Sequence, residues 1–192
     1  MRIRENREAR ERTLVETQIS KRHLLEQLGS LLEYPGTDPR EMLPMTARRM
    51  ETVSIQAADY LKDFFARMKR MELNMWQEFY VRTFDLMPQC PLYLSVHLFG
   101  EESFKRSQLM VGLKNSYEEK GALAMSELPD HLAVVLRHNA LLDDEEWSEL
   151  AAMGILPAIQ IMISKLEKYS NPYALVLKTL QALLQEAEKV HV

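Results

Sequence analysis

The chain has a single cysteine among its 192 residues, and several other features that define classes of protein are also missing. With Cys90 alone, no internal disulfide and no cysteine cage for a metal can form, which fits a reducing compartment. No apolar run reaches about 18 residues, so we expect no transmembrane helix. The start of the chain lacks the apolar stretch of a signal peptide. These absences predict a cytoplasmic protein.

Signals for catalysis and for metal binding are also scarce. The chain has no Gly-rich phosphate loop, no Gly-x-Ser-x-Gly elbow and no His-x-x-x-His pair among its five histidines. Glu127 and His131 have the i, i+4 spacing of two metal ligands, but Pro129 between them interrupts a continuous helix. Cys90 has no basic neighbour in sequence, which favours an inert thiol. We expect no metal, no bound cofactor and no catalytic residue.

The balance of charge argues against a nucleic-acid partner. The formal net charge is −4, whereas nucleic-acid binders usually carry a basic excess. Residues 1–15 form a charged arm whose five arginines could contact a nucleic acid, but three glutamates alternate with them and favour a solvated extension. No linker rich in glycine, serine or proline divides the remainder. We therefore predict an arm at 1–15 and a single domain at 16–192.

Apolar residues recur at helical spacing along the chain, and no strand pair or hairpin turn is visible. We predict an all-α, single-domain, irregular bundle of about seven or eight helices. The apolar stripes include Leu24, Leu25, Leu28, Leu31 and Leu32, then Ile55, Ala58, Leu61, Phe65 and Met68, then Leu109, Met110, Leu113 and Tyr117.

Capping and breaking residues set the expected helix ends. Asp143 and Glu146 have the spacing of a capping box at a helix start, and Gly121 ends the helix that carries Leu109 to Tyr117. We expect Gly154 to stop the helix that begins near Asp143, and Pro157 to open a separate helix.

The segment Ser126–Leu132 combines a fixed turn, an acid and a titratable base at a predicted helix start. Pro129 suits the first turn of a helix, and Asp130 in that turn would favour the positive end of the helix dipole. His131 adds a group that changes charge near neutral pH. The segment is either a well-capped helix start or a recognition corner, and both readings stay open.

Aromatic side chains are dense between residues 76 and 99, and the chain holds twelve methionines. Such a region forms either the core or an apolar groove for a partner's helix or extended peptide. Methionine adapts to irregular surfaces and suits a varied ligand, although filling the core is its commoner use. The aromatic residues are Trp76, Phe79, Tyr80, Phe84, Tyr93 and Phe99.

Several segments follow one another in an order that resembles a known family. They are Leu31–Pro35, Tyr80–Leu86, Leu92-Tyr93-Leu94, His97, Gly100, Glu101, Arg106, Met110, Leu113, Tyr117, Gly121, Glu127–Leu132 and Tyr173-Ala174. Their order and spacing closely resemble the NarJ family, the delta-subunit chaperones of respiratory nitrate reductases and related molybdoenzymes. The resemblance covers about residues 20 to 186, and its most specific part is the Glu-Leu-Pro-Asp-His segment with the upstream Thr-Phe-Asp.

This resemblance implies an all-helical cytoplasmic protein that is not an enzyme. Such chaperones bind the N-terminal segment of a molybdoenzyme catalytic subunit and hold that subunit while its molybdenum cofactor is inserted. The cofactor belongs to the client, so the resemblance implies none for this chain and no insertion into a membrane. By resemblance, the residues that form or support the client site are Thr83, Phe84, Asp85, Tyr93, His97, Phe99, Arg106, Glu127, Pro129, Asp130 and His131.

Two departures from the family pattern concern the identity of the client. After Leu136 the family pattern has an acidic residue and then an aromatic one, whereas this chain has Arg137-His138. The glycine expected after Arg106 is also missing. The client could therefore act on nitrate, selenate, chlorate or a similar substrate. Two other classes stay open, a helical adaptor unrelated to molybdoenzymes and an enzyme that uses Asp130 and His131 for acid–base catalysis.

Overall fold

The computed structural model describes residues 21–122 and 127–188, and it confirms the all-α class. The arm predicted at 1–15 lies outside the described residues. Within them no strand is formed, and the only β-type pairing is an isolated bridge between Tyr93 and His131. The helices are 21–31, α2 (Leu43–Glu51), α3 (Ile55–Met68), α4 (Leu73–Phe84), α5 (Leu94–Phe99), α6 (Phe104–Glu119), α7 (Leu132–Arg137), α8 (Asp144–Glu149), α9 (Leu156–Lys168) and α10 (Tyr173–Glu188), with the 3-10 turns η1 (Pro39–Glu41) and η2 (His138–Leu141) and the π-helical turn η3 (Leu150–Ile155).

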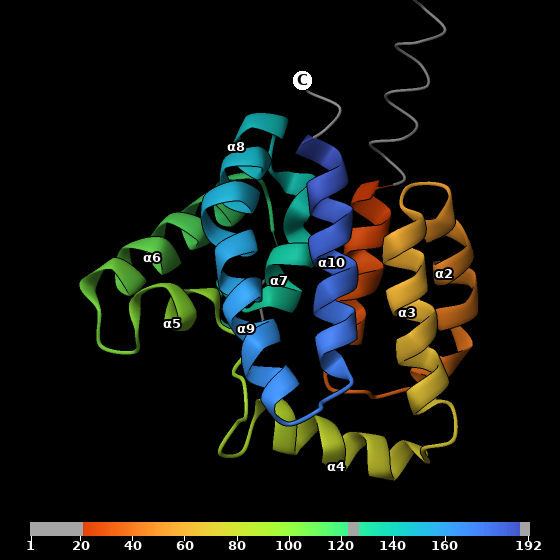
Figure 1. Ribbon diagram of the computed structural model, residues 1–192. Coiled ribbons are helices and arrows are strands. Elements are labelled where there is room, and N and C mark those ends of the chain that lie inside the picture. Colours follow the sequence, from red (N-terminus) through yellow and green to blue (C-terminus); the bar gives the residue numbers. More distant parts are fainter. Residues whose placement is uncertain (1–20, 123–126, 189–192) are drawn as a thin grey trace, which may run out of the picture.

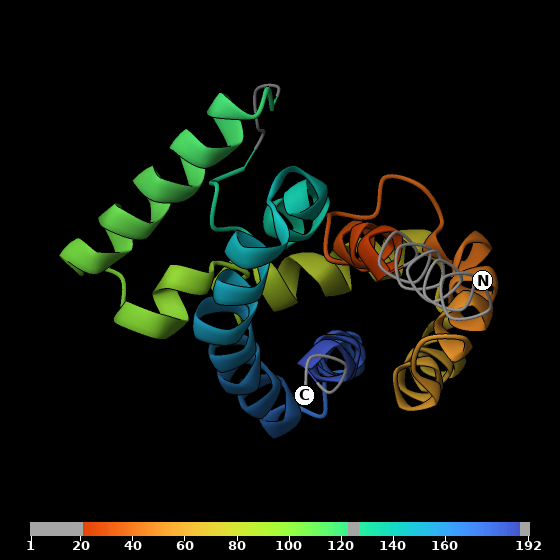
Figure 2. The same cartoon turned by 90° about the horizontal axis from the view of Figure 1, so that it is seen from above.

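Helix α10 lies near the middle of the bundle, between α9 on one side and α3 with α2 on the other (Figures 1 and 2). Helix α4 crosses the lower end of the bundle (Figure 1). Helices α5 and α6 extend away from the body, and α6 stands at the edge of the molecule (Figure 2). Only two side chains of α6, Leu113 and Tyr117, are buried, so the predicted stripe is half-buried at Leu109 and Met110.

Helix α3 buries the predicted stripe at Ala58, Leu61 and Met68 but not at Ile55. Ser54 caps its N-terminus by accepting a hydrogen bond from the backbone N–H of Ala57 at 3.3 Å. Ile55 follows directly and is 71% exposed, so its place in the predicted stripe was wrong. Phe64 is fully buried instead, because its ring packs against Trp76 and Tyr173 with centroids 5.8 and 5.4 Å away.

The prediction that Gly154 stops one helix and Pro157 opens another was wrong. The chain is helical without interruption from Asp144 to Lys168, because the π-helical turn η3 lies just before the proline. A π turn widens the helix locally, and this accommodates a residue that lacks an N–H and crowds the preceding turn. Gly154 is buried inside η3, where a Cβ atom would lie 3.1 Å from the side chain of Leu150.

In the described part of the chain, this helical run alone is long and apolar enough to cross a membrane by length and composition, so the expectation of no such run needs qualification. Of its apolar window, 44% is buried inside the protein. The side chains of Ile159, Met162 and Leu166 are in the core. Core helices of soluble proteins have the same length and composition, so the run does not by itself indicate a membrane span.

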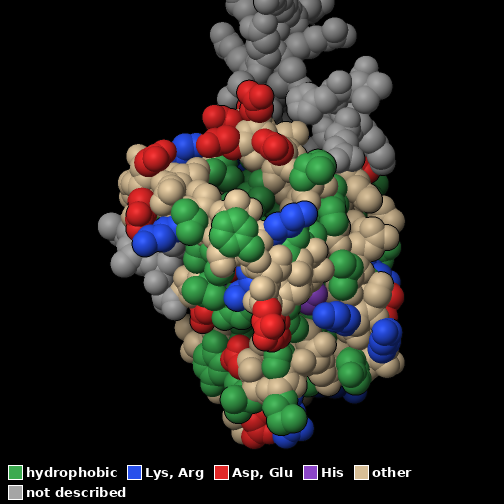
Figure 3. Space-filling model, turned by 90° about the vertical axis from the view of Figure 1, so that its left-hand side faces the viewer, with side chains coloured by type: hydrophobic (Ala, Val, Ile, Leu, Met, Phe, Trp, Pro, Cys, Tyr) green, Lys and Arg blue, Asp and Glu red, His purple; other side chains and the backbone are tan. Residues whose placement is uncertain are grey.

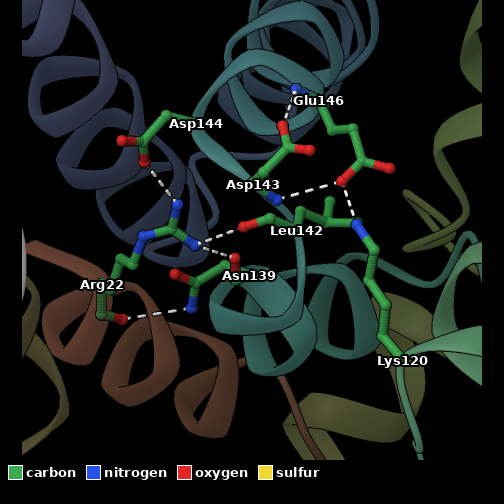
Figure 4. A network of polar contacts seen from close by, with 7 residues as sticks. All are labelled: Arg22, Lys120, Asn139, Leu142, Asp143, Asp144 and Glu146. Carbon is green, nitrogen blue, oxygen red and sulfur yellow. Dashed lines mark hydrogen bonds and ion pairs between the residues drawn. The ribbon is translucent and has the colours of Figure 1, made fainter.

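A polar network joins the helix 21–31 to α8 and to the end of α6 (Figure 4). Arg22 donates to the carbonyl oxygens of Asn139 and Leu142, the latter at 3.0 Å, and pairs with Asp144 at 2.7 Å. Asn139 returns a hydrogen bond to the carbonyl of Arg22 at 3.1 Å. The capping box predicted at the start of α8 is confirmed, and its glutamate also pairs with Lys120. The network fixes the chain on both sides of α7.

Most of the aromatic residues between 76 and 99 belong to the core. The Trp76 indole N–H donates to the Tyr173 hydroxyl at 2.8 Å, and the Tyr80 hydroxyl donates to the carbonyl of Leu32 at 3.0 Å. The Phe84 ring meets Tyr173 edge-on, with the centroids 4.8 Å apart. Burial in this cluster raises the pKa of Tyr173 well above its ordinary value. The core reading therefore holds for Trp76, Tyr80 and Phe84.

Candidate functional site

Residues 127–132 lie against the segment that leads into α5. The backbone N–H of Leu132 donates to the carbonyl of Leu92 at 2.8 Å, and that of Leu94 donates to the carbonyl of Asp130 at 3.0 Å. Between these two bonds, Tyr93 and His131 form the isolated antiparallel bridge. A turn closed by the bond from the N–H of His131 to the carbonyl of Leu128 at 3.0 Å precedes the bridge. The pairing brings two separate sequence motifs into one site.

Asp130 caps a helix, but not the helix that the sequence predicted. Helix α7 begins at Leu132, so Pro129 and Asp130 lie before it and the prediction that they occupy its first turn was wrong. The Asp130 carboxylate instead accepts from the backbone N–H of Ser95 at 3.2 Å and from the Ser95 hydroxyl, at the start of α5. The pairing described above pulls Asp130 across to the neighbouring helix, 35 positions away in sequence. It therefore satisfies an otherwise free N–H of α5.

Asp130 is fully buried, and the groups around it connect it to α6. Arg106, a predicted site residue, donates from Nε to the Ser95 hydroxyl oxygen at 3.1 Å. The second carboxylate oxygen of Asp130 and Nδ1 of His131 are buried without a hydrogen-bond partner in the described part of the chain. Burial lowers the pKa of His131, although the charges of Glu127 and Asp130 act in the opposite direction. The inward part of this segment thus positions α5 and α6.

The outward part of the segment presents negative charge. Glu127 is exposed, and its carboxylate accepts from the Tyr93 hydroxyl at 3.1 Å. The Tyr93 ring in turn meets the His131 imidazole edge-on, with the centroids 5.3 Å apart. Burial and the bond to Glu127 raise the pKa of Tyr93 to about 12, so its hydroxyl keeps its proton.

A second exposed carboxylate lies near Glu127. Asp85 follows the end of α4, and its pKa is raised by partial burial and then by the charge of Glu127. Neither Asp85 nor Glu127 pairs with a cationic side chain among residues 21–122 and 127–188. Exposed apolar side chains accompany the two acids, with Leu86 at 73% and Leu128 at 43%. We name these four residues with Tyr93 the acidic–apolar surface.

The other predicted site residues support this surface or lie apart from it. Thr83 is buried and accepts from the Asn171 side-chain amide at 2.9 Å, and the same amide donates to the side-chain oxygen of Gln89 at 3.0 Å. His97 donates from Nε2 to the carbonyl of Pro91 at 2.7 Å, with Lys165 at 3.3 Å from Nδ1. These bonds fix the loop between α4 and α5.

Phe84 and Pro129 are buried, and Phe99 is 39% exposed at the far end of α5. The face that contains α5 and α6 exposes hydrophobic side chains over much of its area, whereas acidic side chains gather at its upper end, where α8 lies (Figure 3). Sequence reasoning did not identify Ser95, because nothing in the sequence marks it as the partner of Asp130. Leu86 could have been found, since it is a large apolar residue in a turn before a proline.

The described residues form an all-helical bundle that exposes two carboxylates, without a cationic partner among these residues, beside apolar side chains. The family model described as "Nitrate reductase delta subunit" matches residues 50–188. The chain is 31% identical over 165 residues to the "Nitrate reductase molybdenum cofactor assembly chaperone NarJ" of Escherichia coli (strain K12), and the alignment covers 83% of this chain and 69% of that relative. NarJ of Escherichia coli O157:H7 matches to the same extent. The chain therefore belongs to the nitrate reductase delta subunit family.

Proposed function

We propose that this protein is an assembly chaperone of a nitrate reductase-like molybdoenzyme and that it binds the N-terminal segment of the catalytic subunit. The chaperone would hold that subunit, in the cytoplasm, while the client's molybdenum cofactor is inserted. The observation that carries the binding proposal is the acidic–apolar surface, where Asp85 and Glu127 are exposed and near enough for the charge of Glu127 to raise the pKa of Asp85, and where neither pairs with a cationic side chain of the described residues. Family membership and the function for which the relatives are named support the wider role.

The chemistry of this surface favours an amphipathic, basic peptide. Two neighbouring carboxylates repel one another, and a lysine, an arginine or a terminal amine between them removes that repulsion. The apolar side chains of Leu86 and Leu128 would contact the apolar face of the same peptide. Ordering a flexible peptide costs roughly 2–5 kcal/mol, so affinity is moderate and the client can be released. Reversible binding suits a maturation factor.

Asp130 and His131 have a supporting role in this proposal. Asp130 has no exposed surface and holds Ser95 at the start of α5, so it positions the elements around the client instead of contacting the client. His131 is 7% exposed and packs edge-on against the Tyr93 ring. An acid–base pair would need the two side chains to share a proton path, yet the free Asp130 oxygen and His131 Nδ1 form no hydrogen bond with one another. The geometry gives the enzyme reading no support.

Calorimetry with N-terminal peptides of the host's own molybdoenzyme catalytic subunits tests the proposal. We expect a dissociation constant between about 10 nM and 10 μM for the matching peptide. The double variant Asp85→Asn, Glu127→Gln should weaken binding by about 1–3 kcal/mol, because it removes both charge-assisted contacts. Raising the ionic strength from about 50 to about 500 mM should weaken the wild type more than the double variant.

A matched control is the double variant Glu145→Gln, Glu149→Gln, which removes two exposed carboxylates from α8 and should leave the affinity unchanged. Equal losses in this control and in the Asp85 and Glu127 variant would show that only the net charge matters and would contradict a localised site. If no molybdoenzyme peptide gives heat and the full-length client does not co-purify, the adaptor reading replaces this one.

A further inference from the structure

The turn after α4 presents a methionine in a conformation that side chains rarely adopt. Met87 has a backbone φ of +49° and its side chain is 98% exposed. The left-handed region favours glycine and is disfavoured for a residue that carries a Cβ atom. Glycine would relieve this strain, and a polar side chain would avoid exposing an apolar one to water. Neither local stability nor solubility therefore accounts for methionine at this position.

The backbone on both sides of Met87 is fixed. The N–H groups of Asp85 and Leu86 both donate to the carbonyl of Val81 at 3.0 Å, which closes the end of α4. On the other side, the N–H of Cys90 donates to the carbonyl of Thr83 at 3.1 Å. The exposed side chain therefore stands on a turn that is tied down before and after it. Because this turn is already ordered, less conformational entropy is lost when a partner binds to it.

The residues around Met87 indicate the chemistry of the peptide segment that its side chain would contact. Leu86 beside it is 73% exposed, and Asp85 lies two positions before it, where the charge of Glu127 also acts and neither acid pairs with a cation among the described side chains. A peptide segment that carries a cationic side chain next to a bulky apolar one matches both features. Methionine suits such a contact, because its flexible thioether adapts to apolar side chains of different shape.

We propose that Met87 is an apolar anchor of the acidic–apolar surface, and that it inserts against a large apolar side chain of the client peptide adjacent to the cation held by Asp85 and Glu127. This inference rests on the proposed function, because it assigns a specificity-determining residue to the same binding event. It also adds a feature that charge alone does not give, namely selection for the size of one client side chain.

Four single variants separate anchoring from backbone effects. Met87→Asn tolerates the left-handed conformation but removes the apolar side chain, and Met87→Gly removes both the side chain and the strain. Met87→Leu keeps an apolar side chain of similar volume. Ser170→Gly is the matched control, because Ser170 is exposed and has the same conformation with a φ of +51°. The probe is the N-terminal catalytic-subunit peptide that binds the wild type, measured by calorimetry, and thermal unfolding is recorded for every variant.

We expect Met87→Asn and Met87→Gly to weaken peptide binding by about tenfold or more, as buried anchors do. Met87→Leu should stay within about threefold of the wild type. Ser170→Gly should bind as the wild type does, and neither glycine variant should lower the thermal midpoint. With a peptide whose large apolar residue beside the cation is replaced by alanine, the loss caused by Met87→Asn should disappear.

An unchanged affinity in Met87→Asn, with weakened binding in the Asp85 and Glu127 variant, overturns the anchor and leaves the proposed function standing. A loss of the same size in Met87→Leu and Met87→Asn also overturns it, because an apolar side chain of that volume would then make no difference. If the wild type binds no such peptide, both the anchor and the proposed function fall.

Discussion

Removing the Asp130 carboxylate should destabilise the protein more than removing any exposed acid does. In Asp130→Ala the backbone N–H and the hydroxyl of Ser95 both lose their acceptor in a buried site. An unsatisfied buried donor costs about 1–3 kcal/mol, so the two together should lower the free energy of unfolding by roughly 2–6 kcal/mol. Asp130→Asn keeps a side chain of the same shape with one acceptor oxygen. It loses only the contribution of the negative charge to the hydrogen bonds with Ser95, which should lower the free energy of unfolding by about 1–2 kcal/mol.

Urea unfolding at constant pH measures both variants, with Asp59→Ala as the control. Asp59 is an exposed acid of α3 paired with Lys62, and its removal should cost at most about 1 kcal/mol. A double-mutant cycle with Ser95→Ala should give a coupling energy of at least about 1 kcal/mol, because the two residues are in direct contact. If Asp130→Ala costs no more than Asp59→Ala, the carboxylate does not hold α5.

Gly29→Ala should destabilise the folded protein by about 1–2 kcal/mol, because a Cβ atom would lie 3.2 Å from the carbonyl oxygen of Ala133. Gly112→Ala, in the open face of α6, should stabilise it by up to about 1 kcal/mol. Chemical denaturation of the two variants measures both effects. Burial lowers the pKa of His97 below 6.5, as it does for His131, so on acidification the unfolded chain binds protons before the folded chain does. Stability should therefore fall as the pH drops below about 6.5, and His97→Gln should reduce that dependence in unfolding curves. Burial raises the pKa of the Cys90 thiol to about 12. Alkylation of this thiol at about pH 8 should therefore require unfolding. Rapid labelling of the native protein would contradict the burial of Cys90.

The parts of the fold that follow local rules could be predicted from the sequence. The Asp143–Glu146 capping box forms as its spacing predicts, and Gly121 ends α6 with a φ of +82°. Gly154 and Pro157 break the same local rules, because a π-helical turn lets the helix continue through both. Single-residue propensities do not encode such a turn, since it depends on how the whole helix packs against its neighbours.

The candidate site shows the same division between local and distant effects. Asp130 was predicted in the first turn of the helix that follows it, whereas its partner Ser95 lies 35 positions away at the start of α5 and is reached only through the pairing of Tyr93 with His131. Asp85 and Glu127 entered the predicted site through the family resemblance, yet no spacing rule shows that they come close together. Such proximity is a product of the tertiary fold, which one sequence without its structure does not display.

The two readings of the Glu127–His131 segment, a structural cap and a recognition corner, are compatible because its residues face in different directions. Pro129 and Asp130 point inward, where the aspartate organises α5 and reaches Arg106 of α6 through the Ser95 hydroxyl. Glu127 points outward and meets Tyr93 at the surface. The inward bonds hold the backbone that displays the outward charge, so in the proposed function the cap would set the geometry on which client recognition depends. Under the proposed function we therefore expect a variant at Asp130 to alter client binding through stability and position, and a variant at Glu127 to alter it directly.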